Sequence, residues 1–201
     1  MNETFIERLS GYTESGGWVM GPLFAIAAVL WFAIGYRFFT LRRGNRRSVR
    51  VLVERYEEGY RRKPGGIVDG AVVRALEIVR GPGENLRRRL DAGLSAFEVE
   101  IERFSTLVKG LVAAAPLLGL LGTVIGMIET FDSLGDMSLF SQSGGIAGGI
   151  SQALFTTQMG LAVAIPGLLF GRVLEHRQKT FENEISKIKD ILGAAEAGGV
   201  R

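Results

Sequence analysis

Residues 115–126 read APLLGLLGTVIG, and residues 149–166 read GISQALFTTQMGLAVAIP. Both stretches are apolar, yet small and hydroxyl residues recur in them at helical spacing. Small residues let membrane helices approach closely, and polar groups inside a bilayer are costly and usually functional. The two stretches therefore predict a pair of closely packed membrane helices that carry a few functional polar groups.

Charged residues are absent from three stretches of the chain, at 15–36, 110–128 and 137–171. A helix needs about 20 apolar residues to cross about 30 Å of hydrocarbon, so each stretch accommodates one span. We expect an all-α, polytopic membrane protein with transmembrane helices at 18–41, 106–130 and 148–171. The chain contains no Cys, which argues against a disulfide framework or a thiolate metal site, and no metal is expected.

The basic residues predict the orientation of these spans. Seventeen of the 24 Lys and Arg residues lie between residues 37 and 109, one precedes the first span, six follow the third, and none lies between the second and third. The positive-inside rule places segments 1–17 and 131–147 outside, and segments 42–105 and 172–201 inside. This distribution explains the basic character of the chain, so no nucleic-acid partner is expected. Within the inner loop, Arg87, Arg88 and Arg89 either form a solvated face or bind anionic lipid headgroups.

An apolar stripe continues from the inner loop into the second span. Its members recur at spacings of four and three: Leu90, Leu94, Phe97, Ile101, Phe104, Val108 and Leu111. No proline lies between Pro82 and Pro116, so we expect the second membrane helix to start well inside the cytoplasm and run unbroken. A similar stripe extends the third helix inward, and residues 193–201 are expected to form a disordered tail. A lone hairpin cannot bury both of its apolar sides, so oligomerisation is expected.

The small and polar residues of the two quoted stretches admit three interpretations. Gly119, Gly122, Gly126 and Gly160 are candidates for helix packing, with the hydroxyl residues as back-bonding groups. Alternatively, Thr hydroxyls and the Gln152 amide line a hydrated pathway, where they orient water or a partner's titrating group. A third interpretation is a substrate pocket, in which Pro116 and Pro166 either break or simply kink the helices.

Together the two stretches resemble the ExbB/TolQ branch of the MotA/TolQ/ExbB proton-channel family, and most closely the ExbB proteins of TonB-type systems. The resemblance implies an all-helical homopentamer in the bacterial inner membrane, with a periplasmic N-terminus and a cytoplasmic C-terminus. Its second and third helices would line a lumen. That lumen would hold an ExbD/TolR-like single-span partner with an essential Asp, and a TonB-like protein would carry motion to the outer membrane.

The resemblance also assigns roles to particular residues. Thr123 and Thr157 correspond to the family's threonines and would face the partner's Asp, while Thr156 and Gln152 would line the same pathway. Many ExbB proteins carry a Glu where this chain has Gln152, which cannot titrate. Glu129 is the nearest carboxylate, and it is either an interfacial acid or an outer access position for protons. No cofactor is expected beyond protons as the coupling ion.

The expected function is therefore the channel-forming subunit of a proton-motive-force-driven motor that energises TonB-dependent outer-membrane uptake. A TolQ-like motor for envelope maintenance is an alternative within the family. A non-conducting oligomeric scaffold or a pocket-type transporter is an alternative of another class. An enzyme is not expected, because the sequence offers no nucleophile–base pair and its single His, His176, lies among charges.

Overall fold

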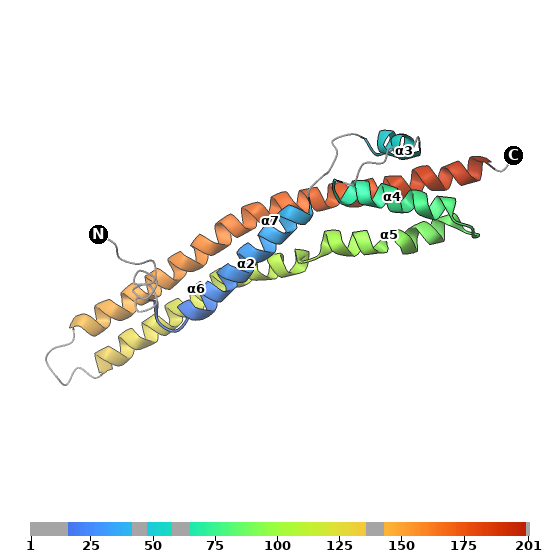
Figure 1. The fold of residues 1–201 in the computed structure, drawn as a ribbon. Helices are drawn as coiled ribbons and strands as arrows, with labels where there is room; N and C mark the ends of the chain where they lie inside the picture. Colours follow the sequence, from blue (N-terminus) through green and yellow to red (C-terminus); the bar gives the residue numbers. More distant parts are fainter. Residues whose placement is uncertain (1–15, 42–47, 58–64, 136–142, 200–201) are drawn as a thin grey trace. The chain divides into compact units, whose positions relative to one another are not determined.

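The structure is a computed structural model that describes residues 16–41, 48–57, 65–135 and 143–199. Regular secondary structure in these residues is helical throughout (Figure 1). Three helical stretches are long and apolar enough to cross a membrane: α2 (Met20–Thr40), Leu86–Gly135 and Ile146–Ala194. The prediction of an α-helical chain with three such stretches is confirmed for the described residues, whereas most of the predicted outer segment 1–17 lies outside them.

Tertiary contacts divide the chain into two compact units. The apolar unit comprises Met1–Ile34 and Leu107–Gly171, and the polar unit comprises Gly35–Thr106 and Arg172–Arg201. Helices α2 and α7 (Ser143–Gly199) contribute to both units, whereas α6 (Ser105–Gly135) belongs almost wholly to the apolar unit.

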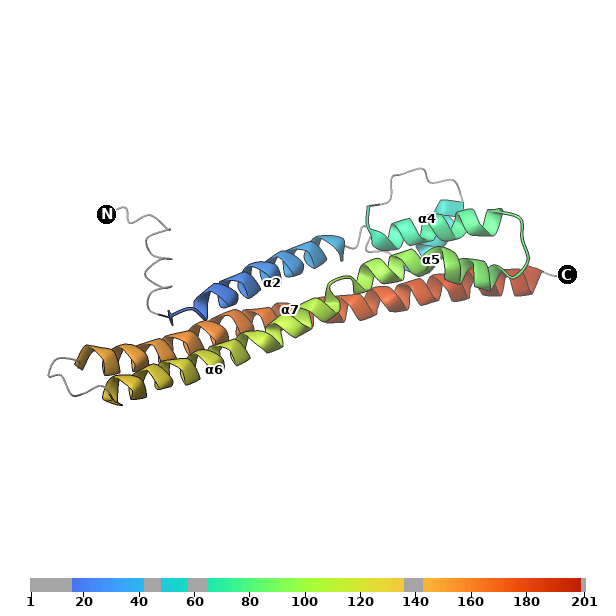
Figure 2. The same ribbon diagram turned by 90° about the horizontal axis from the view of Figure 1, so that it is seen from below.

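In the apolar unit, α6 and the first part of α7 run antiparallel and lie side by side, with α2 next to them (Figure 2). Both long helices continue through their prolines, Pro116 and Pro166, without a break. Both also extend into the predicted outer loop 131–147. Ser133 remains helical and donates its hydroxyl to the carbonyl of Glu129 at 2.8 Å. Neither proline therefore breaks its helix.

The polar unit contains a small helical bundle. α3 (Val49–Glu57) packs on α4 (Ile67–Arg80), and α4 packs on α5 (Leu86–Glu102). These helices and the second part of α7 contribute the fully or nearly fully buried side chains Val72, Leu76, Leu90, Leu94, Ile185 and Ile188. The burial of Leu90 and Leu94 follows the apolar stripe in the sequence, so periodicity located this core.

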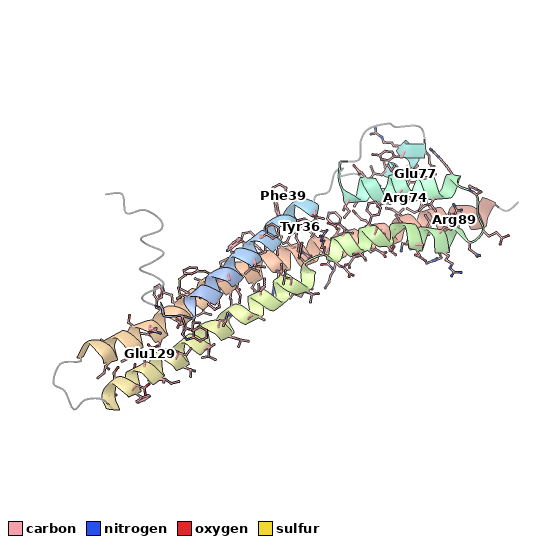
Figure 3. All side chains as sticks on the ribbon, turned by 60° about the horizontal axis from the view of Figure 1, so that its bottom comes forward. Tyr36, Phe39, Arg74, Glu77, Arg89 and Glu129 are labelled. Carbon is pink, nitrogen blue, oxygen red and sulfur yellow. The ribbon has the colours of Figure 1, made fainter. Side chains whose placement is uncertain are left out.

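The arginine cluster of α5 serves contacts within the polar unit. Arg89 donates to the carbonyl oxygens of Ile78 at 2.6 Å and Gly81 at 3.1 Å, and it thereby caps the C-terminus of α4 (Figure 3). Arg87 lies 3.4 Å from Asp190 of α7. Arg89 is therefore engaged by the fold itself, and neither interpretation of the cluster, solvated face or lipid site, anticipated this role.

The predicted unbroken helix from the inner loop into the second span is wrong at one point. α5 ends at Glu102 and α6 begins at Ser105, because Arg103 leaves the helical region (ψ 132°) and Phe104 has a left-handed backbone (φ 60°). A left-handed non-glycine residue costs about 1–2 kcal/mol, so surrounding contacts must hold it. The Phe104 ring packs edge-on against Tyr36, with a centroid distance of 5.2 Å. We call Arg103 and Phe104 the α5–α6 joint.

The expected disordered tail is also corrected. α7 continues to Gly199, well beyond the predicted start of the tail at residue 193. The added stretch reads GAAEAGG, and its Ala and Glu residues are among the strongest helix formers. The terminal glycines are typical of the position where a helix ends. Local propensity therefore extends the helix although the apolar stripe has stopped.

Candidate functional site

A glycine-lined seam joins α6 to α7 in the apolar unit. A Cβ atom on Gly119 would lie 3.0 Å from the carbonyl oxygen of Thr156, and one on Gly160 would lie 2.8 Å from that of Ala115. Gly122 and Gly126 face the same helix, opposite Thr156 and Ala153. All four glycines singled out for packing in the sequence thus lie in this α6–α7 seam. The two backbones are in contact there, which leaves no room for larger side chains.

Two threonine hydroxyls are enclosed in the seam. Thr156 is 0% exposed and donates to a carbonyl of its own helix, either Gln152 at 3.1 Å or Ala153 at 3.0 Å. Thr130 is likewise buried and donates to the carbonyl of Gly126 at 2.8 Å. These hydroxyls are satisfied locally and shielded by the chain's own helices. In this structure Thr156 therefore lies in a packing position between α6 and α7, and its role in a pathway stays a prediction.

Thr123 and Thr157 lie on one flank of the seam. Thr123 donates its hydroxyl to the carbonyl of Leu120 at 2.6 Å. Thr157 donates to its own helix at Ala153 (3.2 Å) or across the seam to Gly119 (3.4 Å). Each residue turns an α-helix by about 100°, so each threonine lies about 60° around its own helix from the centre of the glycine stripe. Because α6 and α7 are antiparallel and both threonines are rotated in the same sense, the two lie on the same side of the helix pair.

This flank is uncovered among the residues that the structure describes. The large side chains next to the two threonines are all strongly exposed: Leu120, Met127, Leu154 and Leu161. Thr123 and Thr157 are themselves partly exposed. A second helix, from another chain, can therefore approach the two hydroxyls directly. We call this surface the threonine flank.

Gln152 and Glu129 lie on the opposite flank. The Gln152 amide donates to the Glu129 carboxylate at 3.3 Å, in the C-terminal part of α6 (Glu129 is labelled in Figure 3). Gly17 has a left-handed backbone (φ 61°), and a Cβ atom there would collide with the Gln152 amide. Farther along the same flank, Trp31 of α2 packs on Phe170 of α7 at a centroid distance of 5.7 Å. The chain itself therefore covers this flank with α2 and the turn before it.

The polar residues grouped as one pathway in the sequence are thus found in three places. Thr123 and Thr157 line the threonine flank, Thr156 lies inside the seam, and Gln152 lies with Glu129 on the flank that α2 covers. Helical geometry alone separates Gln152 from Thr157, since five residues correspond to a rotation of about 140°. Spacing could therefore have revealed this division before the structure did.

Arg37, which the sequence marks only as one of the basic residues on the inner side of the first span, is a buried polar residue in the structure. Arg37 is 3% exposed at the C-terminal end of α2. Its guanidinium donates to the carbonyl of Arg103 at 3.0 Å and to the Gln178 side chain at 2.7 Å. These partners are mainly backbone carbonyls brought together by the fold. No motif in the sequence signals them.

The fold and the seam define an all-helical, multi-pass membrane protein whose two long helices pack through glycine. Residues 67–187 match the model of the MotA/TolQ/ExbB proton channel family. Because this match spans more than half of the chain, the chain belongs to that family. The resemblance drawn from the two quoted stretches is confirmed.

Several named relatives are of the ExbB kind. The chain is 41% identical to ExbB-like 3 of Synechocystis sp. over 88 residues, which are 43% of this chain and 42% of that protein. It is 40% identical to the ExbB homolog of Methanothermobacter thermautotrophicus over 111 residues, 52% of this chain and 38% of that protein. It is 38% identical to the biopolymer transport protein exbB1 of Vibrio cholerae over 72 residues, which are 36% of this chain and 30% of that protein. Each match thus spans less than half of the relative's length.

Proposed function

We propose that this chain is the channel-forming subunit of a proton-motive-force-driven motor in the bacterial inner membrane. With an ExbD-like single-span partner it would energise TonB-dependent uptake across the outer membrane. The observation that carries the proposal is the position of Thr123 and Thr157 on the flank of the seam that the described chain leaves uncovered. Membership of a proton channel family supports an ion-coupled role.

The exposed apolar surface supports assembly into a ring. On α6 and α7 large apolar side chains remain exposed away from the seam: Leu117, Leu120, Val124, Ile128, Leu154, Ile165 and Leu169. Such surfaces must meet lipid or other helices. In a homopentamer with the threonine flank toward the centre, these helices would contact each other, and exposed aromatics of α2 such as Phe32 would contact the bilayer. The basic inner loop orients the chain with its N-terminus in the periplasm.

The two hydroxyls can serve either protonation state of a partner's Asp. A Thr hydroxyl has one donor and two acceptor lone pairs. While Thr123 and Thr157 donate to backbone carbonyls, their free lone pairs can accept a hydrogen bond from a protonated acid. After rotation, the same hydroxyls can donate to the ionised carboxylate. They would thereby orient a proton that the partner's Asp carries.

The energy of one proton suffices for such a switch. Moving one charge across a membrane releases about 2.3 kcal/mol per 100 mV. A neutral hydrogen bond contributes about 0.5–1.5 kcal/mol net. The free energy needed to exchange one hydroxyl hydrogen bond is therefore smaller than the free energy that one proton releases at 100 mV. A surface of weak hydroxyl contacts would let the partner move without deep energetic traps.

The other candidate residues have structural roles in this proposal. Gln152 ties the outer end of α7 to Glu129 of α6 and packs against Gly17, so a neutral amide is sufficient there. Glu129 is an interfacial acid on the covered flank, and Thr156 packs the seam. A complete proton path would thus need a carboxylate from another chain.

The decisive experiment uses the full-length chain with the product of a neighbouring gene that encodes one span with an Asp near its start. The two proteins are co-purified, weighed by native mass spectrometry and reconstituted into proteoliposomes under an imposed potential. We expect proton flux that requires both chains and that disappears when the partner's Asp is changed to Asn. A stable oligomer that conducts no protons with its partner would support a scaffold instead. Envelope leakage with normal uptake in a deletion strain would indicate a TolQ-like role.

A further inference from the structure

Arg37 caps a helix that belongs to another part of the polar unit. Its Nη1 atom donates to the carbonyl oxygens of Arg103 at 3.0 Å and Glu102 at 3.4 Å. These carbonyls lie at the C-terminus of α5, where a helix leaves its last acceptors without partners. The Nη2 atom donates to Gln178 of α7 at 2.7 Å. One buried guanidinium therefore connects α2, the end of α5 and α7.

Acidic and amide side chains surround the charge of Arg37, and they offset part of the penalty that burial imposes on it. Gln178 accepts from Arg37 and donates its own amide to Glu182 at 2.7 Å. The carboxylates of Glu175 and Glu182 lie close enough to attract the guanidinium electrostatically. Hydrogen bonds from a charged donor are stronger than neutral ones, and a planar guanidinium fixes their direction. Arg37 is therefore suited to hold its three helices in one geometry.

A second set of contacts encloses the α5–α6 joint. The Tyr36 hydroxyl donates to Glu100 at 2.7 Å (Tyr36 is labelled in Figure 3). Arg103 donates to the Tyr36 hydroxyl at 3.3 Å, and its guanidinium lies 5.4 Å from the ring centres of both Tyr36 and Phe104. The ring of the left-handed Phe104 is thus held by Tyr36 of α2 and by the guanidinium of Arg103, while Arg37 of α2 binds the carbonyl of Arg103. Such strain persists only where the surroundings determine it.

On the basis of the proposed function, we propose that Arg37 is a positioning residue that couples the membrane helices to the cytoplasmic helices. It holds the α5–α6 joint in its left-handed turn, and α6 continues from that joint to Thr123. Because the same guanidinium binds Gln178, a displacement of one helix at this point is passed to the other two. The role of Arg37 is transmission of motion, and it takes no part in proton transfer.

The test compares proton flux with work in the full complex. For Arg37→Gln, we expect flux close to wild type but uptake per proton lowered roughly 2- to 30-fold, the range typical of residues that modulate coupling. Amide hydrogen exchange in residues 100–106 should rise, while exchange in α4 stays unchanged. Arg74→Gln is the matched control, because Arg74 forms an exposed ion pair with Glu77 of its own helix (both labelled in Figure 3) and should change neither readout.

Two further variants keep the test decisive. Arg37→Lys retains the charge without the planar fork and should recover part of the uptake. If Arg37→Gln does not accumulate, Gln178→Leu removes one partner and should lower uptake per proton in the same direction. Three results for Arg37→Gln would each overturn the coupling role. They are a parallel fall of proton flux and uptake, unchanged uptake, and unchanged hydrogen exchange at residues 100–106. If the wild-type complex conducts no protons, the proposed function fails, and raised exchange in Arg37→Gln would then show only a local structural contact.

Discussion

Gly126 and Gly149 face each other across the α6–α7 seam so closely that a Cβ atom on Gly126 would lie 2.6 Å from the carbonyl oxygen of Gly149. The same atom would lie 2.8 Å from the amide nitrogen of Ala153. These neighbours are backbone atoms, which cannot move aside independently as the end of a flexible side chain can. The position of the two helices therefore depends on glycine at this point.

Replacing Gly126 by Ala should force α6 and α7 apart. The expected loss is about 1–3 kcal/mol, as for other overpacked sites. Thermal unfolding of the detergent-solubilised oligomer measures it. Gly110→Ala in the same helix is the control, because its Cβ atom would meet nothing within 4 Å and Ala favours a helix by up to about 1 kcal/mol. Equal melting temperatures for the two variants would refute the close contact.

Neighbouring threonines of α7 should respond differently to the same substitution. Thr157→Val removes a hydroxyl of the threonine flank and should abolish energised uptake while the pentamer still assembles, and we expect the same of Thr123→Val. Thr156→Val is the matched control, because the Thr156 hydroxyl only donates to carbonyls of its own helix. We expect it to retain most activity and to lose about 0.6 kcal/mol, typical of a hydrogen bond in a membrane protein. Full uptake in Thr157→Val would show that the Thr157 hydroxyl is not part of the proton path.

The seam was predictable because its signal is local. Glycines at spacings of three and four mark a close helix contact wherever their partner lies, and Gly119, Gly122 and Gly126 indeed face α7. The roles of the two flanks were harder to predict, because the sequence does not say which flank α2 covers. The sequence analysis grouped Gln152 with Thr157, although their rotation along one helix could have separated them; only contacts such as Trp31 with Phe170 identify the covered side.

The α5–α6 joint illustrates a feature that sequence patterns miss. The apolar stripe keeps its spacing through Ile101, Phe104 and Val108, and neither Gly nor Pro marks the break. The break depends on tertiary contacts, above all the guanidinium of Arg37 on the carbonyl of Arg103. A backbone carbonyl carries no sequence identity, so neither the joint nor the role of Arg37 could be derived from residue types.

Gln152→Leu tests whether the amide at the covered flank matters for transport. Leu has a similar volume but loses the hydrogen bond to Glu129. We expect near-normal uptake and a decrease in stability of at most about 1.5 kcal/mol, the upper end for one neutral hydrogen bond. Uptake and melting temperature are measured in the same preparation. A loss as severe as that of Thr157→Val would show that the amide takes part in transport.

Lys189 gives the polar unit a defined pH dependence. Its ammonium lies 2.8 Å from Asp91 and 2.9 Å from Glu98 of α5, and its side chain is largely buried. The hydrogen bond from Lys189 lowers the pKa of Asp91. Burial acts to lower the pKa of Lys189, but the hydrogen bonds to Asp91 and Glu98 outweigh it and raise that pKa. Both shifts mean that the folded state favours the charged forms.

The stabilisation by this cluster should therefore be greatest at neutral pH and fade at both extremes. A lowered Asp91 pKa stabilises above the unfolded value of about 3.9 and is lost as the pH falls through the folded value. A raised Lys189 pKa stabilises below about pH 10.4 and is lost as the pH rises through the folded value. Lys189→Gln should lower the melting temperature at pH 7 by up to roughly 2–4 °C, since partly exposed carboxylates contribute at most about 1 kcal/mol. The difference in melting temperature between Lys189→Gln and wild type should shrink toward pH 3. Lys187 is exposed, so Lys187→Gln should change the melting temperature little at either pH. A difference for Lys189→Gln that is equal at pH 3 and pH 7 would show that Lys189 stabilises by packing alone.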